Sequence, residues 1–166
     1  MKIWDDFLEE AKENLSSGIE CEIKMMHSKS ALTRFANSHI HQNVDEESAE
    51  VYLTIHKDNK TTTVSSNITA IKDVKEFIKK AEKSINNSPI DKGWAGLADK
   101  NNSYIETKNF QESTPEERAI KVKEFISKGN ELNSAGYCST SISKYFAWNT
   151  NGLNSSDSSS SALDRK

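Results

Sequence analysis

The chain has 166 residues, of which 34% are hydrophobic and 28% are charged, and its formal net charge is −3. This length corresponds to about one domain with a single buried core. No stretch approaches the roughly 18 uninterrupted apolar residues of a membrane span, and the lack of a basic excess argues against a nucleic-acid-binding protein.

The two cysteines, Cys21 and Cys138, are too few for a zinc ribbon or a disulfide framework. Residues 1–20 carry several acidic side chains and lack the apolar core of a signal peptide. We therefore expect a cytoplasmic chain with reduced thiols.

The first elements follow from the spacing of apolar residues. Apolar residues recur at steps of three and four over residues 3–15, and acidic residues lie near the start of this segment, so a helix is predicted there. Strict alternation over residues 19–25 predicts a strand with one buried face, on which Cys21 lies as a packed thiol. Further short strands are predicted at residues 31–36, 39–45, 49–57 and 61–66, with polar turns at 37–38 and 57–60.

Helical spacing returns over residues 69–86, where five lysines lie opposite the apolar stripe and are expected to be solvated. Residues 87–112 form a polar connector, which we expect Trp94 and Leu97 to attach to the surface.

The clearest helix start is at Thr114, because Pro115 suits the first helical position and Glu117 completes a capping box. We expect this helix to bury a stripe of four apolar residues, namely Ala119, Val122, Ile126 and Leu132.

The sequence of the last third of the chain predicts further strands. Residues 136–148 indicate two strands, followed by a turn at 149–152. The Ser-rich residues 155–161 have the composition of a flexible linker. The order of elements predicts an α+β fold, an antiparallel or mixed sheet with about three helices packed mainly on one face.

The sequence lacks the short motifs of known catalytic sites. It contains no Gly-rich phosphate loop, no G-x-S-x-G elbow, no C-x-x-C and no H-E-x-x-H. We therefore assign no catalytic, cofactor-binding or metal-binding residue in this chain, and we interpret His27 and His56 as surface residues.

The best local candidate for chemistry is the pair His39 and His41, which a strand would point to one face, about 6–7 Å apart. Such a pair can supply two zinc ligands, but a third is needed, and Asp45 lies too far along the strand. We interpret His39, His41 and Asn43 as a polar strand face that contacts a peptide or a partner. We expect it on the side of the sheet opposite the Thr114 helix.

Several segments together resemble the N-terminal domain of the TldD/PmbA family, the metalloproteases once called modulators of DNA gyrase. They occur in the family's order and spacing and cover nearly the whole chain. The segments are Arg34-Phe35-Ala36-Asn37, Ile40-His41-Gln42-Asn43, Thr63-Val64-Ser65-Ser66-Asn67, Trp94-Ala95-Gly96-Leu97-Ala98-Asp99, Thr114-Pro115-Glu116-Glu117-Arg118-Ala119 and Trp148-Asn149-Thr150-Asn151-Gly152-Leu153.

The resemblance implies a protein of two domains. Residues 1–154 correspond to the N-terminal domain, and the Ser-rich tail, 155–166, to a strand cut short that leads to a C-terminal metal-binding domain. In the metal-binding members that second domain holds zinc through a His-Glu-x-x-x-His helix and a later cysteine. Other members lack the metal and act as partner subunits, and the resemblance leaves open which kind the parent protein is.

The implied function is therefore that of a non-catalytic N-terminal domain of a peptidase. It would shape the cleft for a peptide substrate and contact a partner subunit in a homo- or heterodimer, and the chain alone would be inactive. The main alternative is a stand-alone protein-interaction module without a proteolytic parent. A small zinc hydrolase built on His39 and His41 is the third hypothesis.

Overall fold

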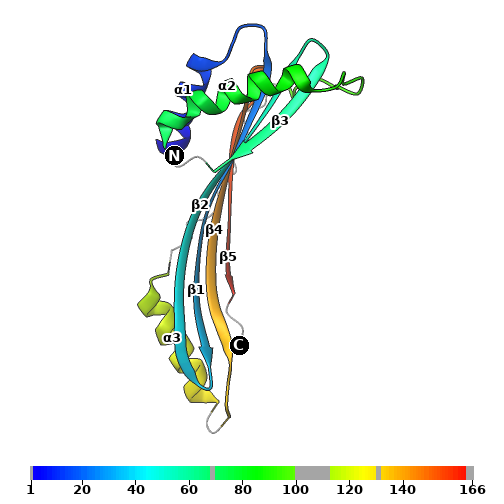
Figure 1. Ribbon diagram of the computed structural model, residues 1–166. Coiled ribbons are helices and arrows are strands. Elements are labelled where there is room, and N and C mark those ends of the chain that lie inside the picture. Colours follow the sequence, from blue (N-terminus) through cyan, green and yellow to red (C-terminus); the bar gives the residue numbers. More distant parts are fainter. Residues whose placement is uncertain (1, 68–69, 100–112, 130–131, 164–166) are drawn as a thin grey trace. The chain divides into compact units, whose positions relative to one another are not determined.

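The computed structural model describes residues 2–67, 70–99, 113–129 and 132–163 (Figure 1). Five strands form one antiparallel sheet in the order β3-β2-β1-β4-β5, and three α-helices accompany it, which confirms the predicted α+β class. The elements are α1 Lys2–Asn14, β1 Glu20–Ala36, β2 His39–Lys57, β3 Lys60–Ser66, α2 Val74–Ser84, α3 Pro115–Lys128, β4 Gly136–Asn149 and β5 Asn154–Leu163, with short 3-10 turns Ile71–Asp73 and Ile85–Asn87 around α2.

Within these described ranges, no helix has the length and apolar character needed to cross a membrane.

The chain divides into two compact units, to which β1, β2, β4 and β5 all contribute residues. Unit 1 comprises Met1–His27, Ala49–Ile105 and Tyr145–Asp157, and unit 2 comprises Ser28–Ser48, Glu106–Lys144 and Ser158–Lys166. The statements below concern the described residues of each unit.

The strands are longer than the alternation of apolar residues predicts. β1 has 17 residues and β2 has 19, and β4 is one strand, so the separate short strands predicted in these regions are wrong. The alternation of apolar and polar residues is lost where both faces of a strand are polar. Backbone hydrogen bonds between the strands still form there, because they do not need apolar side chains. The predicted turns are confirmed, since Asn37, Ser38, Asp58 and Asn59 all have positive φ, as two-residue hairpin turns of type I′ require.

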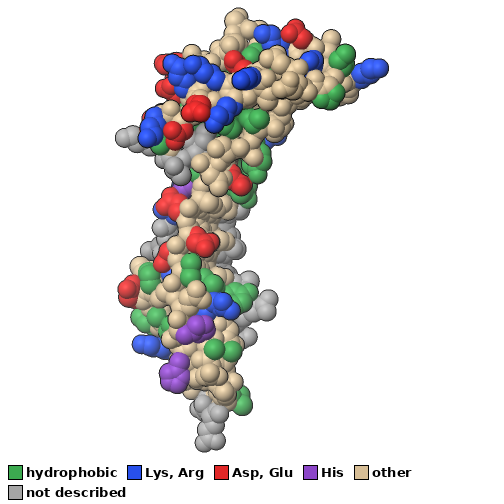
Figure 2. Space-filling model, viewed as in Figure 1, with side chains coloured by type: hydrophobic (Ala, Val, Ile, Leu, Met, Phe, Trp, Pro, Cys, Tyr) green, Lys and Arg blue, Asp and Glu red, His purple; other side chains and the backbone are tan. Residues whose placement is uncertain are grey.

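Unit 1 has an ordinary apolar core. Alternate residues of β1 and β2 are buried, as the period of two requires, and α1 and α2 bury their apolar stripes in the same cluster. The core strand residues are Cys21, Ile23, Met25, Val51, Leu53 and Ile55, and α2 adds Val74, Phe77, Ile78 and Ala81. Figure 2 shows cationic and anionic side chains intermixed on the surface over these helices.

Unit 2 contains the capped helix α3. The backbone N–H of Glu117 donates to Thr114 Oγ1 at 3.2 Å, and the N–H of Thr114 donates to Glu117 Oε2 at 2.8 Å, which confirms the predicted capping box. Val122 is buried as expected, but Leu132 is 73% exposed. The prediction for Leu132 is wrong because the helix ends at Lys128, before that residue.

A buried cation joins α3 to two strands. Arg118 is completely buried, and its three guanidinium nitrogens reach different oxygens. Nε donates to Thr33 Oγ1 at 3.3 Å, Nη1 to the carbonyl of Ser113 at 2.7 Å, and Nη2 to Asp45 Oδ1 at 3.0 Å. This network fixes α3 on the sheet of unit 2 by polar contacts, where unit 1 uses an apolar core.

The Ser-rich segment forms the edge strand β5, so the flexible linker expected from its composition alone is not observed. Strand pairing uses backbone groups, which serine provides as well as any other residue.

Replacing Thr114 with Ala should destabilise the protein by about 0.5–2 kcal/mol, because the Glu117 N–H loses its acceptor. Thermal unfolding should show a melting temperature a few degrees lower. Thr114→Ser is the matched control and should melt close to the parent. A Thr114→Ala variant that melts at the parent temperature would contradict the cap.

Replacing Arg118 with Lys should destabilise unit 2 by about 1–3 kcal/mol, because one ammonium group cannot reach three separated acceptors. Amide hydrogen exchange of Pro115–Lys128 should become faster, while that of Val74–Ser84 should not change. Unchanged exchange in α3 would show that the Arg118 network does not hold the helix.

The Cys21 thiol should react slowly with a maleimide at neutral pH. Burial, with smaller contributions from Glu22 and Glu82, raises the pKa of Cys21 to about 12, so the reactive thiolate is scarce. Mass spectrometry of the labelled native protein should find Cys21 modified much later than Cys138. Equal rates would show that the strand is open to solvent.

Candidate functional site

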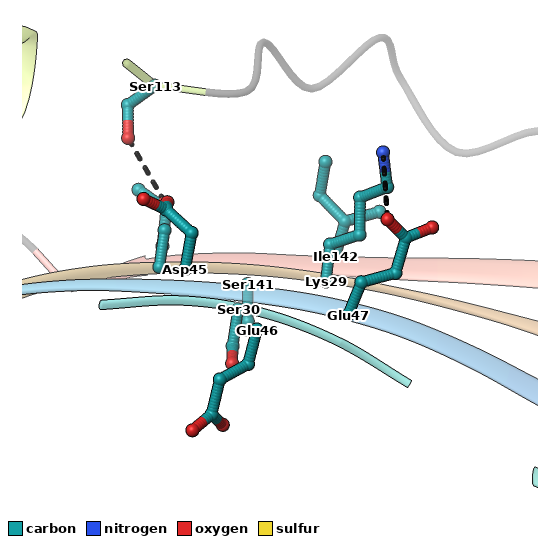
Figure 3. Close-up of a pocket in the computed structure, with 10 residues that line it drawn as sticks. Lys29, Ser30, Asp45, Glu46, Glu47, Ser113, Ser141 and Ile142 are labelled. Carbon is teal, nitrogen blue, oxygen red and sulfur yellow. Dashed lines mark hydrogen bonds and ion pairs between the residues drawn. The ribbon is translucent and has the colours of Figure 1, made fainter. Parts of the chain in front are cut away.

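A groove of about 300 Å³ opens on unit 2 (Figure 3). Its walls come from three neighbouring strands and from the residue before the α3 cap. They are Lys29–Ala31 of β1, Asp45–Glu47 of β2, Thr140–Ile142 of β4, and Ser113. The groove thus lies over three adjacent strands of the sheet.

The side chains of β2 alternate at the groove. Asp45 and Glu47 rise from one side of the strand, and Glu46 points the opposite way (Figure 3). Lys29 lies 3.9 Å from Glu47 across the strands. The groove floor therefore presents both signs of charge side by side.

Asp45 links the groove to the buried cation. One of its oxygens accepts from Arg118, yet the side chain is 59% exposed. Nearby, the hydroxyls of Ser113 and Thr140 form a hydrogen bond of 3.1 Å. These groups can donate and accept hydrogen bonds, but no histidine lies among the residues that line the groove to activate a nucleophile.

The predicted contact residues lie at the hairpin end of β2 in the same unit. His39 is exposed, with Nδ1 2.6 Å from the carbonyl oxygen of Asn37, and His41 is exposed as well. Asn43 accepts a hydrogen bond from the hydroxyl of Thr33, which itself accepts from Arg118.

The position of Asn43 corrects one expectation. We expected the His39, His41 and Asn43 row on the side of the sheet opposite the Thr114 helix, but Asn43 joins the network of Arg118, a residue of that helix. Arg118 itself was missed by sequence reasoning. Its spacing of four residues from Val122, on the buried side of the helix, was the available signal.

No zinc site is formed by the residues that the structure describes, since no three His, Cys, Asp or Glu side chains gather there. Within that part of the chain, His39 and His41 therefore lack the third ligand that a zinc site needs.

Unit 1 contains a second polar arrangement, around a segment that we call the strap, residues 88–99. Trp94 of the strap stacks on His56 of β2, with ring centroids 4.5 Å apart and planes within 5°. Its indole N–H donates to Glu20 Oε2 at 2.8 Å. The expected attachment by Trp94 is confirmed, whereas the interpretation of His56 as a simple surface residue is wrong.

The far end of the strap is also anchored. The side chain of Asn149 is buried, and its Nδ2 donates to the carbonyl of Ala98 at 2.9 Å. Its Oδ1 accepts from the backbone N–H groups of Asn151 and Leu153, so the same residue shapes the β4–β5 turn. Two segments that carried the family resemblance, 94–99 and 148–153, therefore contact each other.

The sequence of residues 21–85 matches the family model of PmbA/TldA metallopeptidase domain 1. No curated protein matches the sequence.

Solved structures that share the fold include three from different organisms. They are TldE from Thermococcus kodakarensis (17% identity, TM-score 0.76), a protein described as a modulator of DNA gyrase from Thermotoga maritima (17%, 0.73) and another from Bacteroides thetaiotaomicron (16%, 0.62). Each match covers 96% of this chain, which spans only 37%, 37% and 38% of those proteins. The matched family model and the shared fold support the predicted resemblance to the N-terminal domain of the TldD/PmbA family.

Proposed function

We propose that the chain is the non-catalytic N-terminal domain of a TldD/PmbA-type peptidase, in which it helps to form the cleft for a peptide substrate and contacts a partner subunit. The observation that carries the proposal is the groove of unit 2, which lies over three adjacent strands and is lined by hydroxyl, carboxylate and ammonium groups. The match of residues 21–85 to the family model of PmbA/TldA metallopeptidase domain 1 supports it.

The groove suits a stretch of extended polypeptide. Its volume, about 300 Å³, is at the lower end of ligand sites, enough for a few residues of a chain but not for a folded partner. Hydroxyl and carboxylate groups can bond the peptide backbone, which all sequences share, and Ile142 offers an apolar contact. Such a surface would admit many different sequences.

His39, His41 and Asn43 extend this surface toward the β1–β2 hairpin. Asp45 and His41 are four residues apart on one strand, a separation of about 13 Å. We propose that the exposed imidazoles contact either the peptide that leaves the groove or the partner subunit.

A partly exposed aromatic pair near the same hairpin supports a partner contact. Phe125 is 44% exposed and packs on the buried Phe35, with ring centroids 5.7 Å apart. A Cβ on Gly136 of β4 would lie 2.9 Å from the ring of Phe35, so this strand and the ring are close-packed. Large apolar groups beside polar ones are typical of protein interfaces.

In this proposal the catalytic groups lie outside the chain. The described residues hold no ligand set for a metal, so zinc would be bound elsewhere in a metal-binding parent or would be absent from a partner-type parent. The role of this domain would then be to hold the peptide in the orientation needed for cleavage. Such positioning raises the rate of peptide cleavage, although the domain supplies no catalytic group.

Filling the groove should weaken peptide binding. Replacing Ala31 with Trp adds an indole to the groove wall and should weaken binding of a fluorescent unstructured peptide at least about tenfold, measured by anisotropy. Ser65→Trp adds the same group to an exposed position of β3 in unit 1 and should bind like the parent. A parent chain that binds no peptide, or an Ala31→Trp variant that binds equally well, would contradict the proposal.

A further inference from the structure

The helix α2 of unit 1 presents a row of cations to solvent. Lys75, Lys79 and Lys83 follow each other at steps of four residues, all are exposed, and they lie away from the side of α2 that packs in the core. Within the part of the chain that the structure describes, none of these three ammonium groups has a hydrogen-bond or ion-pair partner, whereas Lys80 is paired with Glu76 at 3.0 Å.

The helix α1 of the same unit presents the opposite charge. Asp5, Asp6 and Glu13 are exposed and lie away from the side of α1 that packs in the core. Among the described residues, these three carboxylates have no cationic partner, whereas Glu9 is paired with Lys12 at 2.9 Å.

The two charged helix surfaces are neighbours. α1 and α2 contact each other and bury their apolar residues in one core. Figure 2 shows side chains of both signs on the surface over these helices. We call the three lysines of α2 and the three carboxylates of α1 together the charged face of unit 1.

The presence of both signs on the charged face restricts the kind of partner that fits it. A membrane with anionic lipids, or a nucleic acid, would attract the lysines but would be repelled by the carboxylates beside them. A second copy of the chain carries the complementary pattern, because its α1 is acidic where α2 of the first copy is basic. A twofold axis between the helices would bring each α1 against the α2 of the other copy, so that the favourable contact occurs twice.

We propose that the charged face of unit 1 is an interface between two copies of this chain, with α1 of each copy against α2 of the other. The face belongs to unit 1 and includes none of the residues that line the peptide groove.

The contact between the two copies should be weak and reversible. Helices of 13 and 11 residues, each about 10 Å wide with its side chains, offer about 300–400 Å² of surface per copy. A standard interface buries about 800 Å² per partner. The complementary charges therefore set which surfaces meet more than how tightly they bind, and salt should weaken the dimer because exposed charges are screened.

Sedimentation of the full chain at several concentrations tests the interface. At an ionic strength of about 0.01 M, the weight-average mass should rise from that of a monomer toward that of a dimer as the protein approaches about 1 mM. At the same protein concentration and an ionic strength of about 1 M, the mass should be that of a monomer. A chain that is monomeric under both conditions, or that associates equally at both, would overturn the proposal.

Two charge-reversed variants identify the surface, and they change only exposed side chains. Lys75→Glu with Lys79→Glu makes the charged face mainly acidic, and Asp6→Lys with Glu13→Lys makes it mainly basic. Each variant alone should remain monomeric at low salt because like charges would meet, whereas an equimolar mixture should form a heterodimer. Self-association of either variant alone, or a mixture that remains monomeric, would overturn the proposal.

Lys121→Glu with Lys123→Glu is the matched control. It reverses two exposed lysines of α3 in unit 2 and gives the chain the same net charge as the variant with Lys75 and Lys79 replaced. This control should associate like the parent at low salt. A monomeric control would show that net charge, and not the charged face, governs the association, and the proposal would fail.

Discussion

The buried guanidinium of Arg118 is the interaction on which unit 2 depends. Among the described residues of unit 2, only two apolar side chains are buried, Phe35 and Val122. Arg118 adds to this small core by bonding Thr33 of β1, Asp45 of β2 and the Ser113 carbonyl before the helix. The same bonds place Asp45 and Ser113 at the walls of the groove, so the element that stabilises the unit also shapes the surface to which we assign peptide contact.

Unit 1 combines two means of attachment. Its helices are held by buried apolar residues, and the strap is held by polar anchors at Trp94 and Ala98. Gly96, between those anchors, has a φ of +87°, a backbone conformation that residues with a side chain rarely adopt. The strap therefore follows a defined path over the unit with little apolar burial of its own, which is the kind of segment that opens at low energetic cost.

Sequence reasoning succeeded where local rules decide the structure. The Thr114 cap, the two hairpin turns and the packed Cys21 follow from residue type and spacing alone. It failed where distant residues decide. Continuous strands through polar stretches depend on pairing partners, and the buried position of Arg118 depends on Thr33 and Asp45, 85 and 73 residues away. The family resemblance identified segments 94–99 and 148–153, but only the structure shows that Asn149 joins them.

The central claim is that unit 2 provides a peptide-binding surface. Chemical-shift mapping on the isotopically labelled chain tests it most directly, because each backbone amide reports separately. Titration with an unstructured peptide should move the signals of Lys29–Ala31, Asp45–Glu47 and Thr140–Ile142, and those of His39 and His41 at the hairpin end. Shifts confined to unit 1, or none at saturating peptide, would contradict the account.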